Sequence, residues 1–473
     1  MLFDLNSPSL AQYHWGTLFC SFSPAAPVDK DTFLKTIAAL IAKAAPWTTD
    51  DELRATVALL HEIAHLAQDL TTGLGHSDYV THRKETVSLL QYASIVIDTD
   101  GRSARPPLRQ PGTPPWFDEK EDSFVAKAQG QLRYYPFEKT PSTRRDSIRG
   151  ILTKDFNRPI PDEFLSDLST QSLLESDAAL TVLNHLNELH TTDVQRAIRE
   201  RNTALYDRNS LGPEYWTAFV YLENVLVHHT DMDEDQARRW MPGLFGLFVD
   251  SALEYPPPAW ILARSENPDD YDPTVKFARL LIAFQQLQGA EMTQFWNALA
   301  AKPADAEAIL LSHSPFRYPS SEEILKAWVD ALDPEVHTGI VAEIRRGACQ
   351  YRLQHGVLMP RRDAALLFSM EAPILYLYKD RGFVKHDWGL RILDTQTNLK
   401  MTNEVLDHFM LMELGDFLFR SGEFRCPHAQ ADICPVVEDD CVSGFSNLAQ
   451  FPESSRCVAR SLLEKCGITF PTT

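Results

Sequence analysis

Residues 49–75 read TDDELRATVALLHEIAHLAQDLTTGLG, and this stretch has the pattern of one long helix. Thr49 and Glu52 match the T-x-x-E capping box, in which the two side chains hydrogen-bond to amides at the start of a helix. Apolar residues then recur at steps of three and four positions, which places on one helical face Leu53, Val57, Leu60 and Ala64. The run HEIAH at residues 61–65 is therefore expected inside a helix.

Two histidines in this run are spaced to bind one metal ion. His61 and His65 lie four positions apart, so both imidazoles project from one face of a helix, and zinc accepts neutral imidazole readily. Glu62 lies to the side of that face, where its carboxylate can take a proton from a metal-bound water without occupying the metal. We interpret the run as a zinc site with Glu62 as a general base. The competing interpretation is a chance pattern of core or surface histidines.

The motif resembles that of the zincin metallopeptidases, which share HExxH on a helix. The longer run HEIAHLAQDLTTGLG is similar to a bacterial family with the signature HExxHxxQD-x-TT. The metzincin subclass is excluded by its own motif, because Gln68 and Thr71 occupy the positions of its Gly and His. Gln68 and Asp69 extend the face of His65, and we expect Asp69 to orient His65 through its other ring nitrogen. The alternative is that both form a polar helix end.

A catalytic zinc has three protein ligands, so one more ligand is needed. We predict Glu175, because its carboxylate lies on an apolar helical stripe, where burial is costly unless a cation compensates it. The resemblance to the HExxHxxQD family also implies a Glu-Ser-x-Ala run on a late helix. Glu85, at a separation from His65 that resembles the gluzincin pattern, and His76, after the glycines, remain alternatives. Asp177 either supports the site or lies in solvent.

The complete site would be that of a gluzincin-like metallopeptidase acting on an intracellular protein or peptide. A zinc-bound water would lose a proton to Glu62 and attack a carbonyl polarised by the metal. Tyr221, His228 and His229 are candidates for stabilising the oxyanion, although such residues on a helix are more often structural. A regulatory protein partner is a further expectation. The rival hypothesis is a non-catalytic zincin-fold scaffold or binding protein with a structural metal, but Glu62 beside both histidines favours catalysis.

A group of cysteines near the C-terminus suggests a second metal. Residues 426–441 read CPHAQADICPVVEDDC, and two more cysteines follow at 457 and 466. Thiolate and imidazole are ligands of closed structural zinc sites, so Cys426, Cys434 and Cys441, with His428 nearby, are candidates. None of the spacings is a tight C-x-x-C pair. Free thiols are therefore the competing interpretation.

The remaining pattern predicts an α+β chain that is mainly α. A small β element is expected within Tyr13–Phe22, and a second strand at Ile374–Tyr378 with a continuation near Phe383. Residues 1–255 are assigned to a zincin-like catalytic region with a Pro-rich loop at about 104–117. Residues 256–425 are expected to form a mainly helical region, and 426–473 a Cys-rich tail. The boundary at 255–256 is placed where YPPPAW and SENPDDYDP indicate a long irregular segment.

Composition narrows the class of partner. The chain has 473 residues, of which 44% are hydrophobic, enough for two or three domains with sizeable cores. Its formal charge is −20 and no block of Lys and Arg stands out, so nucleic acid and anionic membranes are not expected as partners. The first residues lack a basic segment followed by an apolar core, which favours a cytoplasmic location.

Overall fold

The computed structural model is mostly helical, which confirms the prediction of a mainly α chain. It describes most of residues 35–80, 142–202, 213–332 and 340–356, together with 11–14, 19–22, 374–378, 382–386, Leu90 and parts of 407–470. The expected Pro-rich loop at about 104–117, Glu85 and Cys434 lie outside these described residues.

The chain forms two compact units that interleave in sequence. Unit 1 contains Met1–Trp15, Ala25–Ser77 and Tyr135–Glu371, and unit 2 contains Gly16–Pro24, Asp78–Tyr134 and Ala372–Thr473. This division differs from the one expected from the sequence, since residues on both sides of 255–256 belong to unit 1.

Helix α2 (Asp50–Thr71) carries the HEIAH run, as predicted. The capping box is present: the Glu52 amide donates to Thr49 Oγ1 at 3.2 Å, and the Thr49 amide donates to Glu52 Oε2 at 3.2 Å. Every residue from Ala55 to the last residue of the helix is buried. Because α2 is buried on all sides, its polar side chains must find partners inside the protein.

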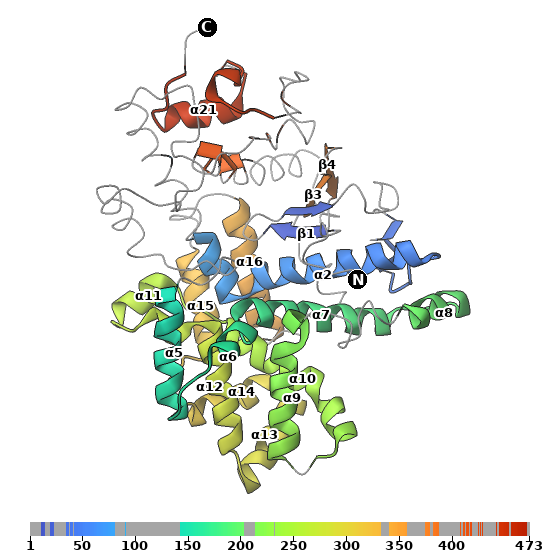
Figure 1. The fold of residues 1–473 in the computed structure, drawn as a ribbon, viewed down its shortest axis with the longest axis vertical. Coiled ribbons are helices and arrows are strands. Elements are labelled where there is room, and N and C mark those ends of the chain that lie inside the picture. Colours follow the sequence, from blue (N-terminus) through green and yellow to red (C-terminus); the bar gives the residue numbers. More distant parts are fainter. Residues whose placement is uncertain are drawn as a thin grey trace. The chain divides into compact units, whose positions relative to one another are not determined.

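Three elements of unit 1 make most of the contacts with α2. Helix α7 (Thr170–Glu188) runs along it, as Figure 1 shows, and strand β1 (Ala11–His14) also contacts it. Helix α16 (Ile340–His355) contacts its C-terminal part. The other helices of unit 1 are α5 (Ser142–Phe156), α6 (Asp162–Asp167), α8 (Asp193–Arg201), α9 (Pro213–His229), α10 (Glu234–Leu253), α11 (Pro258–Ala263), η2 (Pro268–Tyr271), α12 (Pro273–Gln286), α13 (Gly289–Ala301), α14 (Pro303–His313) and α15 (Ser321–Ala331).

The segment around residue 255 is tied into unit 1, which explains why no boundary falls there. The Trp328 indole N–H donates to the carbonyl oxygen of Tyr255 at 2.7 Å. Gly73 lets the same backbone approach closely, because a Cβ at Gly73 would lie 2.3 Å from Tyr255 O. The expected irregular segment also contains two short helices, α11 and η2. The prolines therefore start short helices within a packed region instead of marking a linker.

Unit 2 contains strands β2 (Phe19–Phe22), β3 (Ile374–Tyr378) and β4 (Gly382–His386), with β3 parallel to β2 and antiparallel to β4. It also contains the short helices η3 (Leu448–Gln450) and α21 (Val458–Lys465). Its hydrophobic core is rich in aromatic rings, among them Phe417, Phe424, Phe445 and Phe451.

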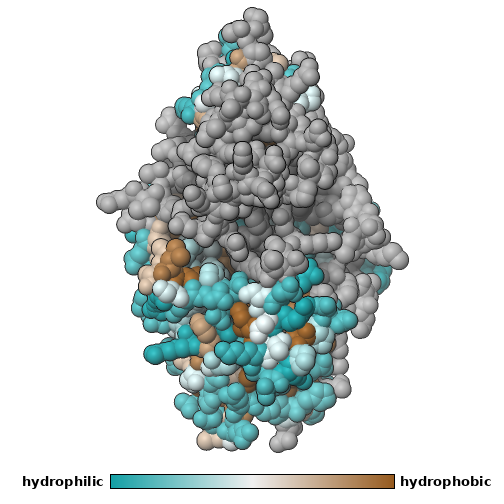
Figure 2. All heavy atoms as spheres, turned by 60° about the vertical axis from the view of Figure 1, so that its left-hand side comes forward, coloured by the Kyte–Doolittle hydropathy of each residue, from teal (hydrophilic) through white to brown (hydrophobic). Residues whose placement is uncertain are grey.

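The described surface is mainly polar on the face drawn in Figure 2, where the apolar patches are small and separate. Exposed large apolar side chains in the described residues are single ones on different helices: Val194, Val220 and Leu262. Within the described part of the chain, no helix has both the length and the apolar character to cross a lipid bilayer.

Candidate metal centre

Three predicted ligands converge between helices α2 and α7. His61 and His65 extend from α2, and Glu175 extends from α7. Glu175 Oε2 lies 3.0 Å from His61 Nε2 and 3.4 Å from His65 Nε2, and the two Nε2 atoms are 3.1 Å apart. We call His61, His65 and Glu175 the metal triad. The structure therefore brings Glu175, the predicted third ligand, to the two histidines.

The spacing of the metal triad fits a tetrahedral ion. Zinc binds histidine nitrogen at about 2.0–2.1 Å, so two of its ligand atoms in tetrahedral geometry lie about 3.4 Å apart. The three separations in the triad, 3.0, 3.1 and 3.4 Å, are near this value. A cation among the three atoms would contact all of them at once, whereas a proton can bridge only two.

The charges of the triad also favour a cation. Burial alone would lower the pKa of His65, but the Glu175 carboxylate, together with Glu62 and Gln68, raises this pKa to about 9. Burial would raise the pKa of Glu175, but the two imidazoles beside it hold this pKa well below its usual range. The cluster thus stabilises positive charge, and a divalent cation would supply that charge.

Gln68 fixes the ring orientation of His65. Its side-chain oxygen lies 2.9 Å from His65 Nδ1, while its amide nitrogen donates to Leu174 O and to Asp177 Oδ2, each at 2.9 Å. Because the amide nitrogen faces two acceptors, its oxygen must face His65. Nδ1 of His65 therefore carries a proton, and Nε2 is the atom that would give up its proton to bind a metal in the triad.

The prediction that Asp69 orients His65 is wrong. Asp69 Oδ1 instead accepts a hydrogen bond from Arg345 Nη2 at 2.8 Å, and its Oδ2 accepts one from the Tyr13 hydroxyl at 2.6 Å. The partner of Gln68 on α7, Asp177, is buried and does not lie in solvent. Sequence spacing alone does not separate the roles of these two adjacent polar residues, because Asp177 lies 109 positions from Gln68 and Arg345 lies 276 positions from Asp69.

Glu62 lies beside the triad and is not one of its three converging ligands. The backbone N–H of Tyr13, in strand β1, donates a hydrogen bond to Glu62 Oε2. Burial raises the pKa of Glu62, although the nearby imidazoles of His61 and His65 oppose this effect. A buried carboxylate that lies beside the triad and outside it is suitably placed to accept a proton.

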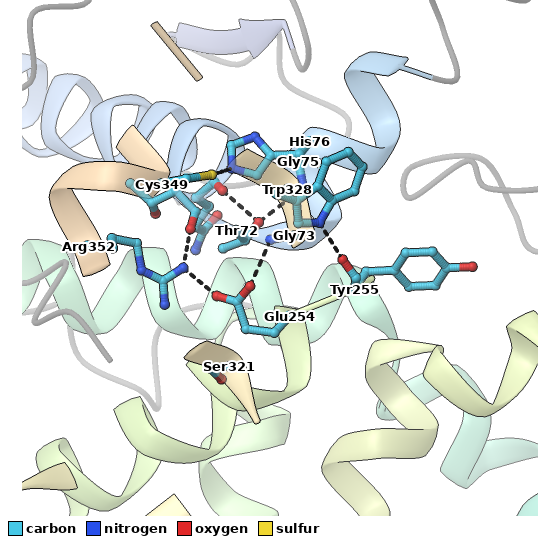
Figure 3. A network of polar contacts seen from close by, with 12 residues as sticks. Thr72, Gly73, Gly75, His76, Glu254, Tyr255, Ser321, Trp328, Cys349 and Arg352 are labelled. Atoms are coloured by element: carbon cyan, nitrogen blue, oxygen red, sulfur yellow. Dashed lines mark hydrogen bonds and ion pairs between the residues drawn. The ribbon is translucent and has the colours of Figure 1, made fainter. Parts of the chain in front are cut away.

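A second buried polar group holds the C-terminal end of α2. We call Arg345, Arg352, Asp69 and Glu254 the arginine cluster. Arg345 Nη1 also donates to Asp69 O at 2.7 Å, and Arg352 donates to Glu254 Oε1. The other oxygen of Glu254 accepts the Gly73 amide at 3.1 Å, and Figure 3 shows these contacts around Arg352. The turn that follows α2 is therefore fixed through charged hydrogen bonds to α16.

His76 lies near the two arginines of the arginine cluster and is not part of the metal triad. Its Nε2 lies 2.9 Å from Cys349 Sγ, and its ring packs near that of Trp328 (Figure 3). Burial, followed by the charges of the nearby arginines, lowers the pKa of His76 well below its usual value. Burial raises the pKa of the Cys349 thiol. Both side chains therefore stay neutral near pH 7.

Of the aromatic residues on α9, Tyr215 lies beside the triad, with its ring centroid 5.7 Å from that of His61. The predicted candidates lie elsewhere: Tyr221 packs edge-on against Phe164, His228 is exposed, and His229 packs edge-on against Phe284. No local pattern marks Tyr215, because its place depends on how α9 packs against α7.

Three of the C-terminal cysteines, Cys426, Cys441 and Cys457, lie buried in the aromatic core of unit 2. Within the described residues, the metal triad is the group of three His, Cys, Asp or Glu side chains with a spacing suited to a metal. His428 Nε2 instead pairs with Asp407 Oδ1 at 2.6 Å. Since Cys434 lies outside the described residues, a second zinc at Cys426, Cys434 and Cys441 stays a prediction.

Comparison of the chain with protein-family models, with curated proteins and with solved structures gives no match.

Proposed function

We propose that this protein is a zinc-dependent peptidase with a zincin-like core, in which the metal triad holds the ion and Glu62 is the general base. The observation that carries the proposal is the convergence of three potential ligand atoms, 3.0–3.4 Å apart, on two packed helices. The resemblance to the gluzincin-like HExxH enzymes, with two histidines and a later glutamate as ligands, supports it.

The residues of the triad suit zinc. Two neutral imidazoles and one carboxylate are a donor set that zinc prefers, and three protein ligands leave a fourth position for catalysis. When bound there, zinc would lower the pKa of a water molecule and polarise a substrate carbonyl.

The protein's own groups would do the remaining work. Gln68 keeps the Nε2 lone pair of His65 directed into the triad. Glu62 would accept a proton from the attacking water and donate it to the leaving amine, which is the usual sequence for a general base in amide hydrolysis. The substrate would be an intracellular protein or peptide, with a regulatory protein as a further partner. The charge of −20 argues against nucleic acid and membrane partners.

One observation favours a second function, that of a non-catalytic scaffold stabilised by a metal. Glu62 is buried and its Oε2 accepts the backbone N–H of Tyr13, as a purely structural carboxylate would. Against this, a structural site would be closed by a fourth protein ligand, and within the described residues only three converge.

Metal analysis combined with the Glu62→Gln variant separates the two functions. The purified protein should contain about one zinc per chain, and Glu62→Gln should retain it. Cleavage of unfolded casein and of a mixed peptide library, followed by mass spectrometry, should fall about 100- to 10,000-fold in Glu62→Gln, because that is the usual contribution of a general base. Glu188→Gln, an exposed change on α7, is the matched control and should cleave like the wild type.

Two outcomes would contradict the peptidase. Absence of zinc after loading would remove its basis. Equal cleavage by the wild type and Glu62→Gln would show that the activity comes from another site or from a contaminant. Zinc binding with no cleavage by the wild type would favour the scaffold.

A further inference from the structure

Tyr13 contacts two carboxylates of α2 with two different groups. Its backbone N–H donates to Glu62 Oε2, and its hydroxyl donates to Asp69 Oδ2 at 2.6 Å. Glu62 and Asp69 are seven positions apart, about two helical turns, so they lie on the same face of α2. Tyr13 therefore spans this face: its backbone contacts Glu62, the proposed general base, and its hydroxyl contacts Asp69 near the C-terminal end of α2.

Asp69 is itself held in one orientation. Its side chain and that of Arg345 are both 0% exposed, and their charged groups pair at 2.8 Å. Arg345 also donates to Asp69 O and Gly75 O, which keeps the guanidinium in place at the end of α2. With Oδ1 committed to the guanidinium, Oδ2 is directed to the Tyr13 hydroxyl.

We infer that Tyr13 and Asp69 are positioning residues for Glu62. Arg345 fixes Asp69, Asp69 anchors the Tyr13 ring, and the anchored strand places its backbone N–H on one oxygen of Glu62. The other oxygen is then presented in a single direction. Catalytic groups must be held within about 0.5 Å of their working geometry, and a glutamate side chain with three rotatable bonds needs such support. This inference rests on the proposed function of Glu62.

The contacts between Tyr13 and α2 are buried, which favours strand β1 as a permanent support for Glu62 and not as a segment that moves away to open the site. If strand β1 withdrew, Asp69 Oδ2 would lose its tyrosine donor in a region where the carboxylate is fully buried. A buried carboxylate oxygen without a donor is unfavourable. The strand is therefore expected to stay in place during catalysis and to guide Glu62.

The test uses Tyr13→Phe, which removes only the hydroxyl, and Asp69→Asn, which replaces the carboxylate that accepts the hydrogen bond from that hydroxyl with a weaker acceptor. Tyr351→Phe, on half-buried Tyr351 of α16, is the matched control. The probe is acetohydroxamate added to the cobalt-substituted protein, followed by visible absorption. Its oxygens bind a metal, and its N–H and O–H groups donate to a carboxylate beside that metal, so its affinity reports the placement of Glu62.

We expect Glu62→Gln to weaken acetohydroxamate binding about tenfold, the usual worth of one charge-assisted hydrogen bond. Tyr13→Phe and Asp69→Asn should weaken it about three- to tenfold. Zinc content and thermal midpoint serve as controls for the fold, and zinc content should equal that of the wild type. Hydrogen exchange of the Tyr13 amide should also be faster in Asp69→Asn, while Tyr351→Phe should match the wild type in every measurement. In a cleavage assay, kcat should fall with KM unchanged.

Several results would overturn the inference. Acetohydroxamate affinity that is unchanged or higher in Tyr13→Phe would do so, and a higher affinity would identify strand β1 as a cover. If Tyr13→Phe and Asp69→Asn lose zinc content and acetohydroxamate affinity to the same extent, Tyr13 and Asp69 support the metal or the fold instead of Glu62. If Glu62→Gln does not change the affinity, Glu62 does not face the metal and the inference is wrong. If binding depends on Glu62 but the wild type cleaves no peptide, the peptidase fails while the positioning role stands.

Discussion

Two buried polar groups contact helix α2, and they differ in how their charges are balanced. In the arginine cluster, all four carboxylate oxygens accept hydrogen bonds from protein donors: Arg345 and Tyr13 for Asp69, and Arg352 and Gly73 for Glu254. In the metal triad, two ring nitrogens and a carboxylate oxygen face one another instead. The carboxylates of the first group are fully paired within the chain, whereas on the proposed function a cation from outside would complete the second.

The largest effect is expected from a substitution that removes one residue of the metal triad. His65→Ala removes one of the three proposed zinc ligands. Substitution of a residue that only supports a ligand lowers metal affinity about 10- to 100-fold, and loss of the ligand itself should lower it further. Zinc per chain, measured after dialysis against a weak chelator, should drop to background. The exposed His190→Ala serves as control and should keep its zinc. Full zinc content in His65→Ala would refute the site.

The next largest effect is expected from a substitution that disrupts the arginine cluster and leaves the metal triad intact. Arg352→Leu leaves the buried Glu254 carboxylate without its guanidinium, which should lower the free energy of unfolding by about 3–5 kcal/mol. Urea unfolding measures this, and zinc content per folded chain should not change. Arg54→Leu removes a partner from an exposed pair and should cost less than about 1 kcal/mol. If Arg352→Leu and Arg54→Leu lower the free energy of unfolding by similar amounts, the arginine cluster is not the buried, charge-balanced group described here.

A smaller effect concerns the close packing at the end of α2. A Cβ at Gly73 would lie 2.3 Å from Tyr255 O, so Gly73→Ala forces the backbone apart and should cost about 1–3 kcal/mol in thermal unfolding. Nothing lies within 4 Å of a Cβ at Gly243, inside α10. Gly243→Ala should therefore be neutral or stabilise by about 0.5–1 kcal/mol. Equal shifts of the thermal midpoint would argue against the packing described.

The smallest effect is expected from reversing the hydrogen bond between Gln68 and Asp177, which supports His65 of the triad. Gln68→Glu places two carboxylates face to face at Asp177 and should lower zinc affinity about tenfold. Adding Asp177→Asn restores a donor, so the double variant should recover most of the affinity, as measured by competition with a chelator. If Asp177→Asn gives no recovery, the contact between Gln68 and Asp177 does not support His65.

The local part of the site could be predicted from the sequence because its signals are local. The capping box at Thr49, the apolar period of α2 and the spacing of His61 and His65 all lie within one helix. Glu175 could be proposed as well, since a carboxylate on an apolar stripe needs compensation. Its place beside His61, 114 positions away, comes from the packing of α7 on α2.

The roles of the surrounding polar residues could not be predicted. Gln68 and Asp69 are adjacent and both polar, and their functions are decided by Asp177 on α7 and Arg345 on α16. Tyr13 carries no motif, and its contacts depend on the placement of a short strand against α2. The same holds for the expected boundary at 255–256, where prolines suggested a linker and the backbone of Tyr255 is instead packed against Gly73.

The position of Glu175 on α7 has a consequence for biosynthesis. The two histidines leave the ribosome long before Glu175, since 114 positions separate His61 from Glu175. The nascent chain therefore has an incomplete ligand set until α7 has been made and has packed on α2. On the proposed function, the folding of the core acts as a safeguard, because hydrolysis cannot begin on a partly made chain.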